Sequence, residues 1–425
     1  MKVLGIETSC DETAAAVVED GRRILSNVVV SQIDIHRAFG GVVPEVAARS
    51  HIEAILPVIE EALVQAKSGD PDRAVRVASR RGSPEQCFLS SEKFSGEELM
   101  SGPEHPEDEL DFADVIPEGS LDFASLWDSI DAIAVSTCPG LIGSLMIGVQ
   151  TAKTLALLKN KPLFPVHHVE AHVYANFLTE SPAGHSVSPE RHSGLDPESR
   201  DTFPILALIV SGGHSQIVLF RDHGDYQILG ATRDDAVGEA FDKVAKIIGL
   251  PYPGGPSIAA AATKGNPKKY HLPKPKLDNP YEFSFSGLKT AVLRAVQSEC
   301  GKDYTFPSNA LSGLLNDAQR QDFAASFQNT AVEILVEAVC QAQAEFQPKS
   351  VVIAGGVAAN QELRRQLSAA LPVEIAYAPP ELCTDNAAMV ASLGYFKSQK
   401  TAPANLHQIK ITPSISMAET GWAKA

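Results

Sequence analysis

The stretch VLGIETS, residues 3–9, is a short apolar run that ends in small polar side chains. Such a run predicts a buried β-strand with the polar residues at its carboxyl end. Two further strand patterns follow at 13–18 and 24–30. A later apolar strand at 130–135 leads into the glycine turn 139–143 and a helical pattern. Strands that alternate with helices in this way predict an α/β protein.

The second half of the chain repeats this plan. The apolar run ILALIV at 205–210 ends in Ser-Gly-Gly-His, and strand patterns follow at 215–220 and 226–231. A later strand at 351–354 leads into the glycine turn 355–360 and a helix. Two copies of one α/β plan predict two similar lobes that face a central cleft, as in the duplicated actin-like ATPase (ASKHA) fold.

Two shifts in composition interrupt the duplicated plan. Residues 68–129 hold 15 Asp and Glu against 5 Lys and Arg, and most of the segment shows no helix or strand period. Residues 180–203 are similarly acidic and rich in proline. Both segments are predicted to be poorly ordered, acidic insertions. We expect an N-terminal lobe at 1–160, a C-terminal lobe at 161–400, and a tail at 401–425 that packs partly on the N-terminal lobe.

The overall composition excludes several classes of protein. The chain has 425 residues, 44% of them hydrophobic, and a net charge of −16. Binding of nucleic acid by bulk positive charge is therefore excluded, and such binding needs a local basic patch or a partner. No apolar run suits a membrane span, and the first residues enter a strand pattern, so we expect no membrane segment, signal peptide or transit peptide. Six cysteines without a CxxC pair indicate reduced thiols and a cytoplasmic protein.

The sharpest local signal for chemistry is the stretch HHVEAH, which begins at His167. In a helix, His168 and His172 lie one turn apart on the same face, where two imidazoles can bind one metal ion. Val169 stands where an HExxH peptidase motif has its glutamate, Glu170 points elsewhere, and His167 is the spare histidine. The spacing alone leaves open that these histidines only cap or line the helix.

A third metal ligand has to come from another part of the chain. The best candidate is Asp385, which follows a strand pattern at 373–377 and precedes a helix that begins at Ala387. Two imidazoles and one carboxylate suit iron, zinc or manganese and leave positions open for a substrate oxygen. The alternative for Asp385 is an N-cap of the following helix, and Cys383 is a weaker rival as ligand.

Glycine pairs form the second signal, in SGG at 211–213, PGGP at 253–256 and GG at 355–356. Glycine lets backbone N–H groups approach an anion, and helix N-termini add partial positive charge. Three such turns in a duplicated α/β plan predict a nucleotide site. The sequence has no GxxxxGK[ST] motif, so this is not a P-loop ATPase.

A third signal is the basic stretch KGNPKKYHLPKPK at 264–276, with five lysines in an acidic chain. Such a stretch can follow a phosphate backbone. A solvated loop explains it equally well, and both interpretations stay open.

Nine blocks of sequence, in this order, resemble the TsaD/Gcp (YgjD) family of tRNA threonylcarbamoyladenosine synthases. They are GIETSCDET at 5–13, GGVVPEVAAR at 40–49, PVHHVEAH at 165–172, LIVSGGHSQ at 208–216, GEAFDKVAK at 238–246, YPGGP at 252–256, FSFSGLKTA at 283–291, AGGVAAN at 354–360 and CTDNAAM at 383–389. The resemblance runs from Met1 to about Lys397 outside the two insertions, which most members lack. Cys138 and Ala388 stand where the family commonly has glycine.

The resemblance implies an enzyme that transfers a threonylcarbamoyl group from threonylcarbamoyl-AMP to an adenosine amine in tRNA. The acceptor is the adenosine 3′-adjacent to the anticodon in tRNAs that read codons beginning with A. The resemblance also implies one divalent metal per chain, iron(II) or else zinc, bound by His168, His172 and Asp385. The implied substrate-binding residues are Ile209, Val210, Ser211, Gly212, Gly213, Asp242, Gly255 and Asn360. No residue is assigned as general acid or base.

Partners and rival functions follow from the same resemblance. It implies a heterodimer with an inactive paralogue (TsaB-like), a small P-loop ATPase (TsaE-like), and tRNA as substrate. The main alternative is a metal-dependent endopeptidase of the O-sialoglycoprotein endopeptidase type, which Val169 argues against. A non-enzymatic actin-like scaffold or a kinase of this fold is a further alternative. Thr8, Ser9 and Glu12, near the first turn, are additional candidates for substrate contact.

Overall fold

The computed structural model describes residues 1–68, 75–79, 123–179, 202–420 and 422. Its strands are β1 (Lys2–Glu7), β2 (Glu12–Glu19), β3 (Arg23–Ser31), β4 (Val75–Ser79), β5 (Ala132–Cys138), β6 (Leu163–His167), β7 (Ile205–Val210), β8 (Ser215–Asp222), β9 (Asp225–Ala231), β10 (Ser350–Ala354) and β11 (Ile375–Tyr377). Its α-helices are α1 (Ile33–Arg37), α2 (Pro44–Ser68), α4 (Phe123–Trp127), α5 (Ile142–Lys159), α6 (His168–Tyr174), α7 (Val237–Ile248), α8 (Gly254–Ala262), α9 (Ser286–Glu299), α10 (Asp317–Phe346), α11 (Gln361–Ala370), α12 (Pro380–Cys383) and α13 (Ala387–Ser398). Among the described residues, no helix is both long and apolar enough to cross a membrane.

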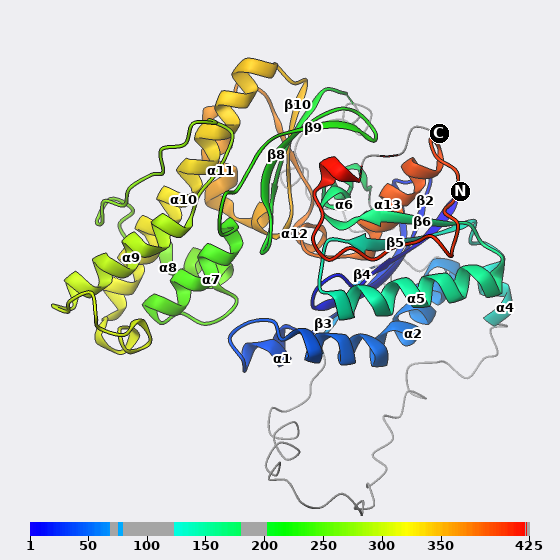
Figure 1. The fold of residues 1–425 in the computed structure, drawn as a ribbon, viewed down its shortest axis with the longest axis horizontal. Coiled ribbons are helices and arrows are strands. Elements are labelled where there is room, and N and C mark those ends of the chain that lie inside the picture. Colours follow the sequence, from blue (N-terminus) through cyan, green and yellow to red (C-terminus); the bar gives the residue numbers. More distant parts are fainter. Residues whose placement is uncertain (69–74, 80–122, 180–201, 421, 423–425) are drawn as a thin grey trace, which may run out of the picture.

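The chain forms two lobes, each built on one β-sheet (Figure 1). The strand order is β4-β3-β2-β1-β5-β6 in the first sheet and β11-β10-β7-β8-β9 in the second. β1 pairs antiparallel with β2 and parallel with β5, and β7 pairs in the same two ways with β8 and β10. One further parallel strand, β6 or β11, completes each copy. The duplicated actin-like fold that the sequence predicts is therefore confirmed.

β1 is covered by helices on both faces, which is why the residues between Lys2 and Glu7 are all apolar. Leu4 and Ile6 pack with buried side chains of α2 and α5, whereas Val3 packs with those of α13. α13 approaches the strand closely because Gly5 has no side chain: a Cβ at this position would lie 2.2 Å from the carbonyl oxygen of Ala387. A helix near the end of the chain is thereby held against the first strand.

Two regular elements lie inside the predicted insertion at 68–129. β4 pairs in parallel with β3 at the edge of the first sheet. α4 buries Leu126 and Trp127 in the core of the first lobe. Composition alone does not indicate these two elements, because five residues are too few to stand out in the acidic composition of the longer segment. The poor order predicted for the insertion as a whole stays a prediction. The remainder of this insertion, and residues 180–201 of the second, lie outside the described residues.

Later segments of the chain return to the first lobe. β6, beyond residue 160, pairs with β5. In the tail, the Thr412 N–H donates to the Thr137 carbonyl (3.1 Å), and the Gly140 N–H donates to the Pro413 carbonyl (3.0 Å). Segments from both sides of residue 160 therefore build the first lobe. The predicted boundaries between the two lobes and the tail stay predictions.

Candidate metal centre

The two histidines of the HxxxH pattern lie on α6, which begins directly after β6. The side chain of His167 caps this helix, because its Nδ1 accepts a hydrogen bond from the Glu170 N–H at 3.4 Å. His168 and His172 follow on the next turn, and their ring centroids lie 4.7 Å apart. Both side chains are buried, with exposed fractions of 9% and 1%. The helical spacing predicted for this pair is confirmed.

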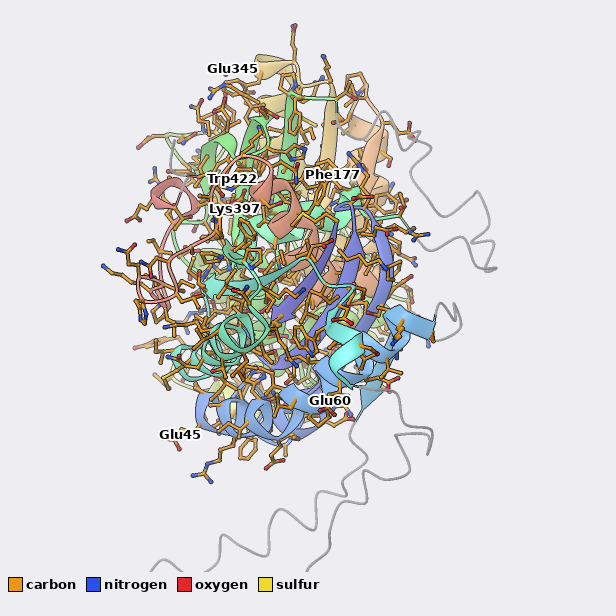
Figure 2. All side chains as sticks on the ribbon, turned by 90° about the vertical axis from the view of Figure 1, so that its right-hand side faces the viewer. Glu45, Glu60, Phe177, Glu345, Lys397 and Trp422 are labelled. Carbon is orange, nitrogen blue, oxygen red and sulfur yellow. The ribbon has the colours of Figure 1, made fainter. Side chains whose placement is uncertain are left out.

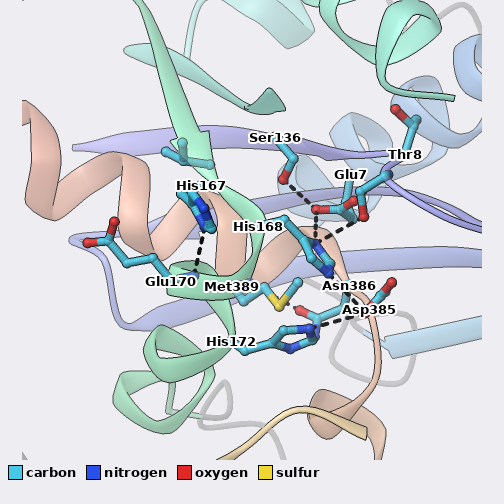
Figure 3. Close-up of polar contacts among 12 residues, drawn as sticks. Glu7, Thr8, Ser136, His167, His168, Glu170, His172, Asp385, Asn386 and Met389 are labelled. Atoms are coloured by element: carbon cyan, nitrogen blue, oxygen red, sulfur yellow. Dashed lines mark hydrogen bonds and ion pairs between the residues drawn. The ribbon is translucent and has the colours of Figure 1, made fainter. Parts of the chain in front are cut away.

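Asp385 reaches the histidine pair from the opposite end of the sequence (Figure 3). Its Oδ1 lies 3.5 Å from His168 Nε2 and 3.3 Å from His172 Nε2. The N-cap of α13 is Asn386, whose side chain accepts from the Met389 N–H, so the alternative of Asp385 as the cap is wrong. The structure therefore brings the three predicted ligands together.

Cys383, the rival ligand, points into the protein instead. Its Sγ lies 3.3 Å from the Ala378 carbonyl oxygen, which accepts a hydrogen bond from the thiol. Burial raises the pKa of this thiol to about 11, so the thiolate that binds metal ions is disfavoured. These observations favour Asp385 as the third ligand.

The three side chains fit a single metal ion. One ligand atom from each lies within 4.8 Å of the others. Neither ring nitrogen of His172 has a hydrogen-bond partner among the described residues, although both are buried. A buried polar atom without a partner is costly, and a cation between the Nε2 lone pair and the carboxylate would remove that cost.

Electrostatics of the cluster favour positive charge. Burial lowers the pKa of His168, but the carboxylates of Glu7 and Asp385 outweigh this effect and raise it to about 9. Burial raises the pKa of Asp385, yet His168 and His172 hold it below its ordinary value. The paired carboxylates and imidazoles therefore attract a proton or a metal ion to this position.

Glu170 and His167 lie away from the metal cluster, as predicted. The Glu170 carboxylate accepts hydrogen bonds from Trp422 Nε1 (3.0 Å) and from the Tyr226 hydroxyl (3.4 Å). His167 and Glu170 line a cavity of about 310 Å³ together with Lys397 and Trp422, and Figure 2 shows the last two near each other. No member of the metal cluster lines this cavity, so it is a separate feature.

The serine–glycine turn after β7 borders open space. Ile209 and Val210 are fully buried at the end of the strand. Ser211 is bound into the turn, because its N–H donates to the His214 carbonyl and its Oγ accepts from the His214 N–H. A Cβ added to Gly212 or Gly213 would meet no atom within 4 Å. The turn leaves room for a ligand next to its backbone.

The other predicted substrate residues lie on neighbouring elements. Asp242 Oδ1 accepts from the Gly254 N–H (2.6 Å) at the start of α8, and a Cβ added to the adjacent Gly255 would meet nothing within 4 Å. The Asn360 side chain caps α11, accepting from the Leu363 N–H at 3.1 Å. Asp242 and Asn360 thus have structural partners, and their contacts with substrate stay predictions.

Two residues near the cluster escaped the sequence analysis. Glu7 lies behind His168 and contacts its Nδ1 at 3.1 Å. His214 is close enough to be influenced by the charges of the three candidate ligands, and burial lowers its pKa to about 4. One feature of the sequence could have pointed to both residues. Glu7 stands at the carboxyl end of an apolar strand and His214 in the turn after another, and α/β proteins bind ligands at such positions.

Comparisons with known proteins support one family. The sequence profile of TsaD, described as tRNA N6-adenosine threonylcarbamoyltransferase, matches residues 23–77, 121–193 and 185–392. The chain belongs to this family. The family profile does not match residues 78–120, which lie inside the first predicted insertion. The resemblance drawn from the nine sequence blocks is confirmed.

Individual relatives match almost end to end. Proteins of the same description are 42% identical in Thermomicrobium roseum and 40% identical in Geobacillus kaustophilus. The matches cover 96% and 98% of this chain, and 94% and 96% of those relatives. Among solved structures, component A of the (R)-2-hydroxyglutaryl-CoA dehydratase of Acidaminococcus fermentans is 13% identical, with a TM-score of 0.41 over 94% of this chain and 100% of that chain.

Proposed function

We propose that this chain is a tRNA N6-adenosine threonylcarbamoyltransferase. It transfers the threonylcarbamoyl group from threonylcarbamoyl-AMP to the exocyclic amine of the adenosine 3′-adjacent to the anticodon, in tRNAs that read codons beginning with A. A C–N bond forms to the carbamoyl carbon, the bond from that carbon to the phosphate oxygen breaks, AMP leaves with the electron pair, and the amine loses a proton. The observation that carries the proposal is membership of this family, with 42% identity to a relative over 96% of the chain.

The cluster on α6 supplies the metal-binding part of this proposal. His168, His172 and Asp385 would hold one divalent ion, iron(II) or else zinc. When bound, the ion supplies positive charge that polarises an oxygen of the acyl donor. The unpartnered nitrogens of His172 support this assignment.

Backbone groups at the glycine turns would bind the nucleotide part of the donor. Within the proposed substrate-binding run from Ile209 to Gly213, the N–H groups of Gly212 and Gly213 are suited to a departing phosphate, because both glycines border open space. The Ser211 N–H already donates to the His214 carbonyl. Asp242 and Gly255 are proposed for the ribose side of the nucleotide, and Asn360 for a further nucleotide contact. Adenine amines are weak nucleophiles, so holding the acceptor close to the donor contributes as much as a base would, and none is assigned.

A metal-dependent endopeptidase is not favoured. Such an enzyme needs a carboxylate beside its histidine pair to activate water. Val169 occupies that position in the sequence. Glu170 faces the other side of α6, where Trp422 and Tyr226 bind its carboxylate.

We propose tRNA as the acceptor, a TsaB-like paralogue as heterodimer partner, a TsaE-like ATPase as a third component, and a cytoplasmic location. The net charge of −16 supports a need for partners or a local basic patch in tRNA binding.

The test is reconstitution with threonylcarbamoyl-AMP, unmodified tRNA and the two partner proteins. Nucleoside analysis by mass spectrometry should detect threonylcarbamoyladenosine, and a matched tRNA with guanosine at the acceptor position should stay unmodified. The proposal fails if the complete mixture yields no modified adenosine while the metal-loaded protein is folded. Protein cleavage that disappears in the His168→Ala variant would instead support the endopeptidase.

A further inference from the structure

Glu7 is a carboxylate buried at the carboxyl end of β1. Its side chain is 0% exposed and contacts His168, the first residue of α6. A buried carboxylate is costly unless donors surround it. Within the described residues no lysine or arginine forms an ion pair with Glu7, and its one ion-pair partner there is His168. The groups that contact Glu7 should therefore indicate the role of this buried carboxylate.

Three donors converge on this carboxylate, and Figure 3 shows Ser136 and His168 among them. The Ser9 N–H donates to Oε1 at 2.6 Å. The Ser136 hydroxyl, at the end of β5, donates to Oε2 at 2.5 Å. His168 Nδ1 lies 3.1 Å from the same Oε2. Two strands of the first sheet thus fix the carboxylate in place behind the first candidate metal ligand.

This contact decides which nitrogen of His168 faces the metal position. Ser9 Oγ also lies 3.1 Å from Nδ1, and a hydroxyl can donate or accept. The Glu7 carboxylate can only accept, so its hydrogen bond with His168 requires a proton on Nδ1, and the Ser9 oxygen then accepts from the same proton. Nε2 is then the atom with the free lone pair, and Nε2 is the nitrogen that faces Asp385 at 3.5 Å. His172 differs, because neither of its nitrogens has a hydrogen-bond partner in the described part of the chain. Only one of the two imidazoles is therefore oriented before a metal binds.

We propose that Glu7 is the positioning residue of the metal centre, which orients His168 and fixes the tautomer that presents Nε2 to the ion. The inference rests on the proposed function only in assuming that His168, His172 and Asp385 bind a metal. A carboxylate behind a metal-binding histidine fixes its orientation and raises its basicity, and loss of such a partner lowers metal affinity by about 10–100-fold.

A purely structural role for Glu7 predicts a different outcome. Its bonds to Ser9 and Ser136 join the ends of β1 and β5. If that were its whole role, a substitution would lower thermal stability without changing the affinity of the folded protein for metal. Metal affinity, measured below the unfolding temperature, separates the two roles.

The experiment compares Glu7→Gln with Glu170→Gln in the full chain. Glu170 is a matched control: it is a second buried carboxylate at α6, it has two hydrogen bonds of its own, and it does not contact His168. Co²⁺ and Zn²⁺ affinities are measured by competition with a chromophoric chelator. We expect Glu7→Gln to bind both ions about 10–100-fold more weakly and to change the visible Co²⁺ spectrum. The metal affinities of Glu170→Gln should stay within about twofold of those of the unchanged chain, a difference of about 0.4 kcal/mol.

A folded Glu7→Gln variant with unchanged Co²⁺ affinity and spectrum would overturn the proposal, whatever its melting temperature. Where that variant does not fold, ¹⁵N-histidine NMR of the unchanged Zn²⁺-loaded protein decides. We expect His168 to carry its proton on Nδ1, and a proton on Nε2 would overturn the inference. If the unchanged protein binds neither ion, the assignment of the metal ligands fails instead, so the two failures are distinguishable.

Discussion

At the scale of single residues, His172 and His168 have opposite surroundings although they share one face of α6. His168 contacts Glu7 and Ser9 through Nδ1. His172 is 1% exposed, its Nε2 lies 3.3 Å from Asp385 Oδ1, and neither of its ring nitrogens has a hydrogen-bond partner among the described residues. A buried imidazole of this kind is stabilised by a metal ion more than by any group that the chain itself provides.

The first prediction concerns His172. His172→Ala removes one of three proposed ligands and should lower the bound metal well below one ion per chain. Elemental analysis of protein purified without chelators measures this. His271→Ala, at an exposed position in the basic loop, is the control and should leave the metal content unchanged. Equal metal content in the two variants would contradict the ligand assignment.

At the scale of elements, the close packing of α13 on β1 places Asp385 at the metal centre. Gly5 permits this approach, and Asn386 starts the helix one residue after the carboxylate. The position of the third ligand therefore depends on a glycine in a strand of the other half of the sequence.

The second prediction tests this dependence. Gly5→Ala should lower the free energy of unfolding by about 1–3 kcal/mol, because the new Cβ would lie 2.2 Å from the Ala387 backbone oxygen and the helix has to shift. It should also weaken metal binding. Denaturant unfolding and chelator competition measure the two effects. The control is Gly287→Ala, at an exposed helical position where an added Cβ would meet no atom within 4 Å. It should not lower the free energy of unfolding. A Gly5→Ala variant as stable as the unchanged chain would show that α13 tolerates the side chain.

The loop between α8 and α9 contains the basic stretch 264–276, which is a candidate for contact with tRNA. Lys264, Lys268 and Lys269 are exposed on it. Lys274 differs, because its ammonium group lies 2.7 Å from the Glu333 carboxylate and also contacts Glu337. Only part of the basic stretch is thus available to a polyanion.

The third prediction follows from this difference. Changing Lys264, Lys268 and Lys269 together to Gln should weaken tRNA binding and reduce the slope of log affinity against log salt by about 2–3, since each phosphate contact contributes about 0.7–0.9. Lys274→Gln, the control, should change the slope by less than about 0.5. Filter binding over a range of salt concentrations measures both. An unchanged slope in the triple variant would favour the solvated loop.

At the scale of the whole molecule, His223 helps to join the two lobes. It lies at the turn between β8 and β9 of the second sheet, and its ring stacks on Phe396 of α13 with centroids 4.0 Å apart. The Tyr174 hydroxyl, at the end of α6, lies 3.1 Å from His223 Nδ1. α6, which carries two candidate metal ligands, and α13, which begins two residues after Asp385, therefore both meet the second sheet at this histidine.

The fourth prediction is a pH dependence of stability. Burial lowers the pKa of His223 to about 4; Asp222 raises it, and Lys400 and Arg22 lower it further. Between pH 4 and the unfolded value near 6.5, the unfolded chain binds the extra proton. The contribution of His223 to stability is therefore complete above about pH 6.5 and is lost as the pH falls towards 4. His223→Gln should flatten this part of the profile in denaturant titrations, whereas His271→Gln should not. Identical profiles for His223→Gln and the unchanged chain would contradict the assignment.

Local patterns in the sequence were enough for much of this protein. The apolar runs, their repetition and the four-residue spacing of His168 and His172 are readable because strand and helix periods are properties of neighbouring residues. The same reasoning missed β4 and α4, whose five residues are too few to outweigh the acidic composition around them. It also missed Glu7, because a single carboxylate at the end of a strand has no distinctive local pattern.

Patterns along the chain are sufficient to predict the duplicated α/β plan, the family and the pair of histidines. They do not predict that Asp385 faces this pair while Cys383 points away, or that Glu7 contacts His168 from 161 positions away, and these contacts are known only from the folded chain. The physical reason is that each such contact depends on how closely separate elements pack. Here that packing is set by the missing side chain of Gly5 and by the way α13 crosses back to the first sheet.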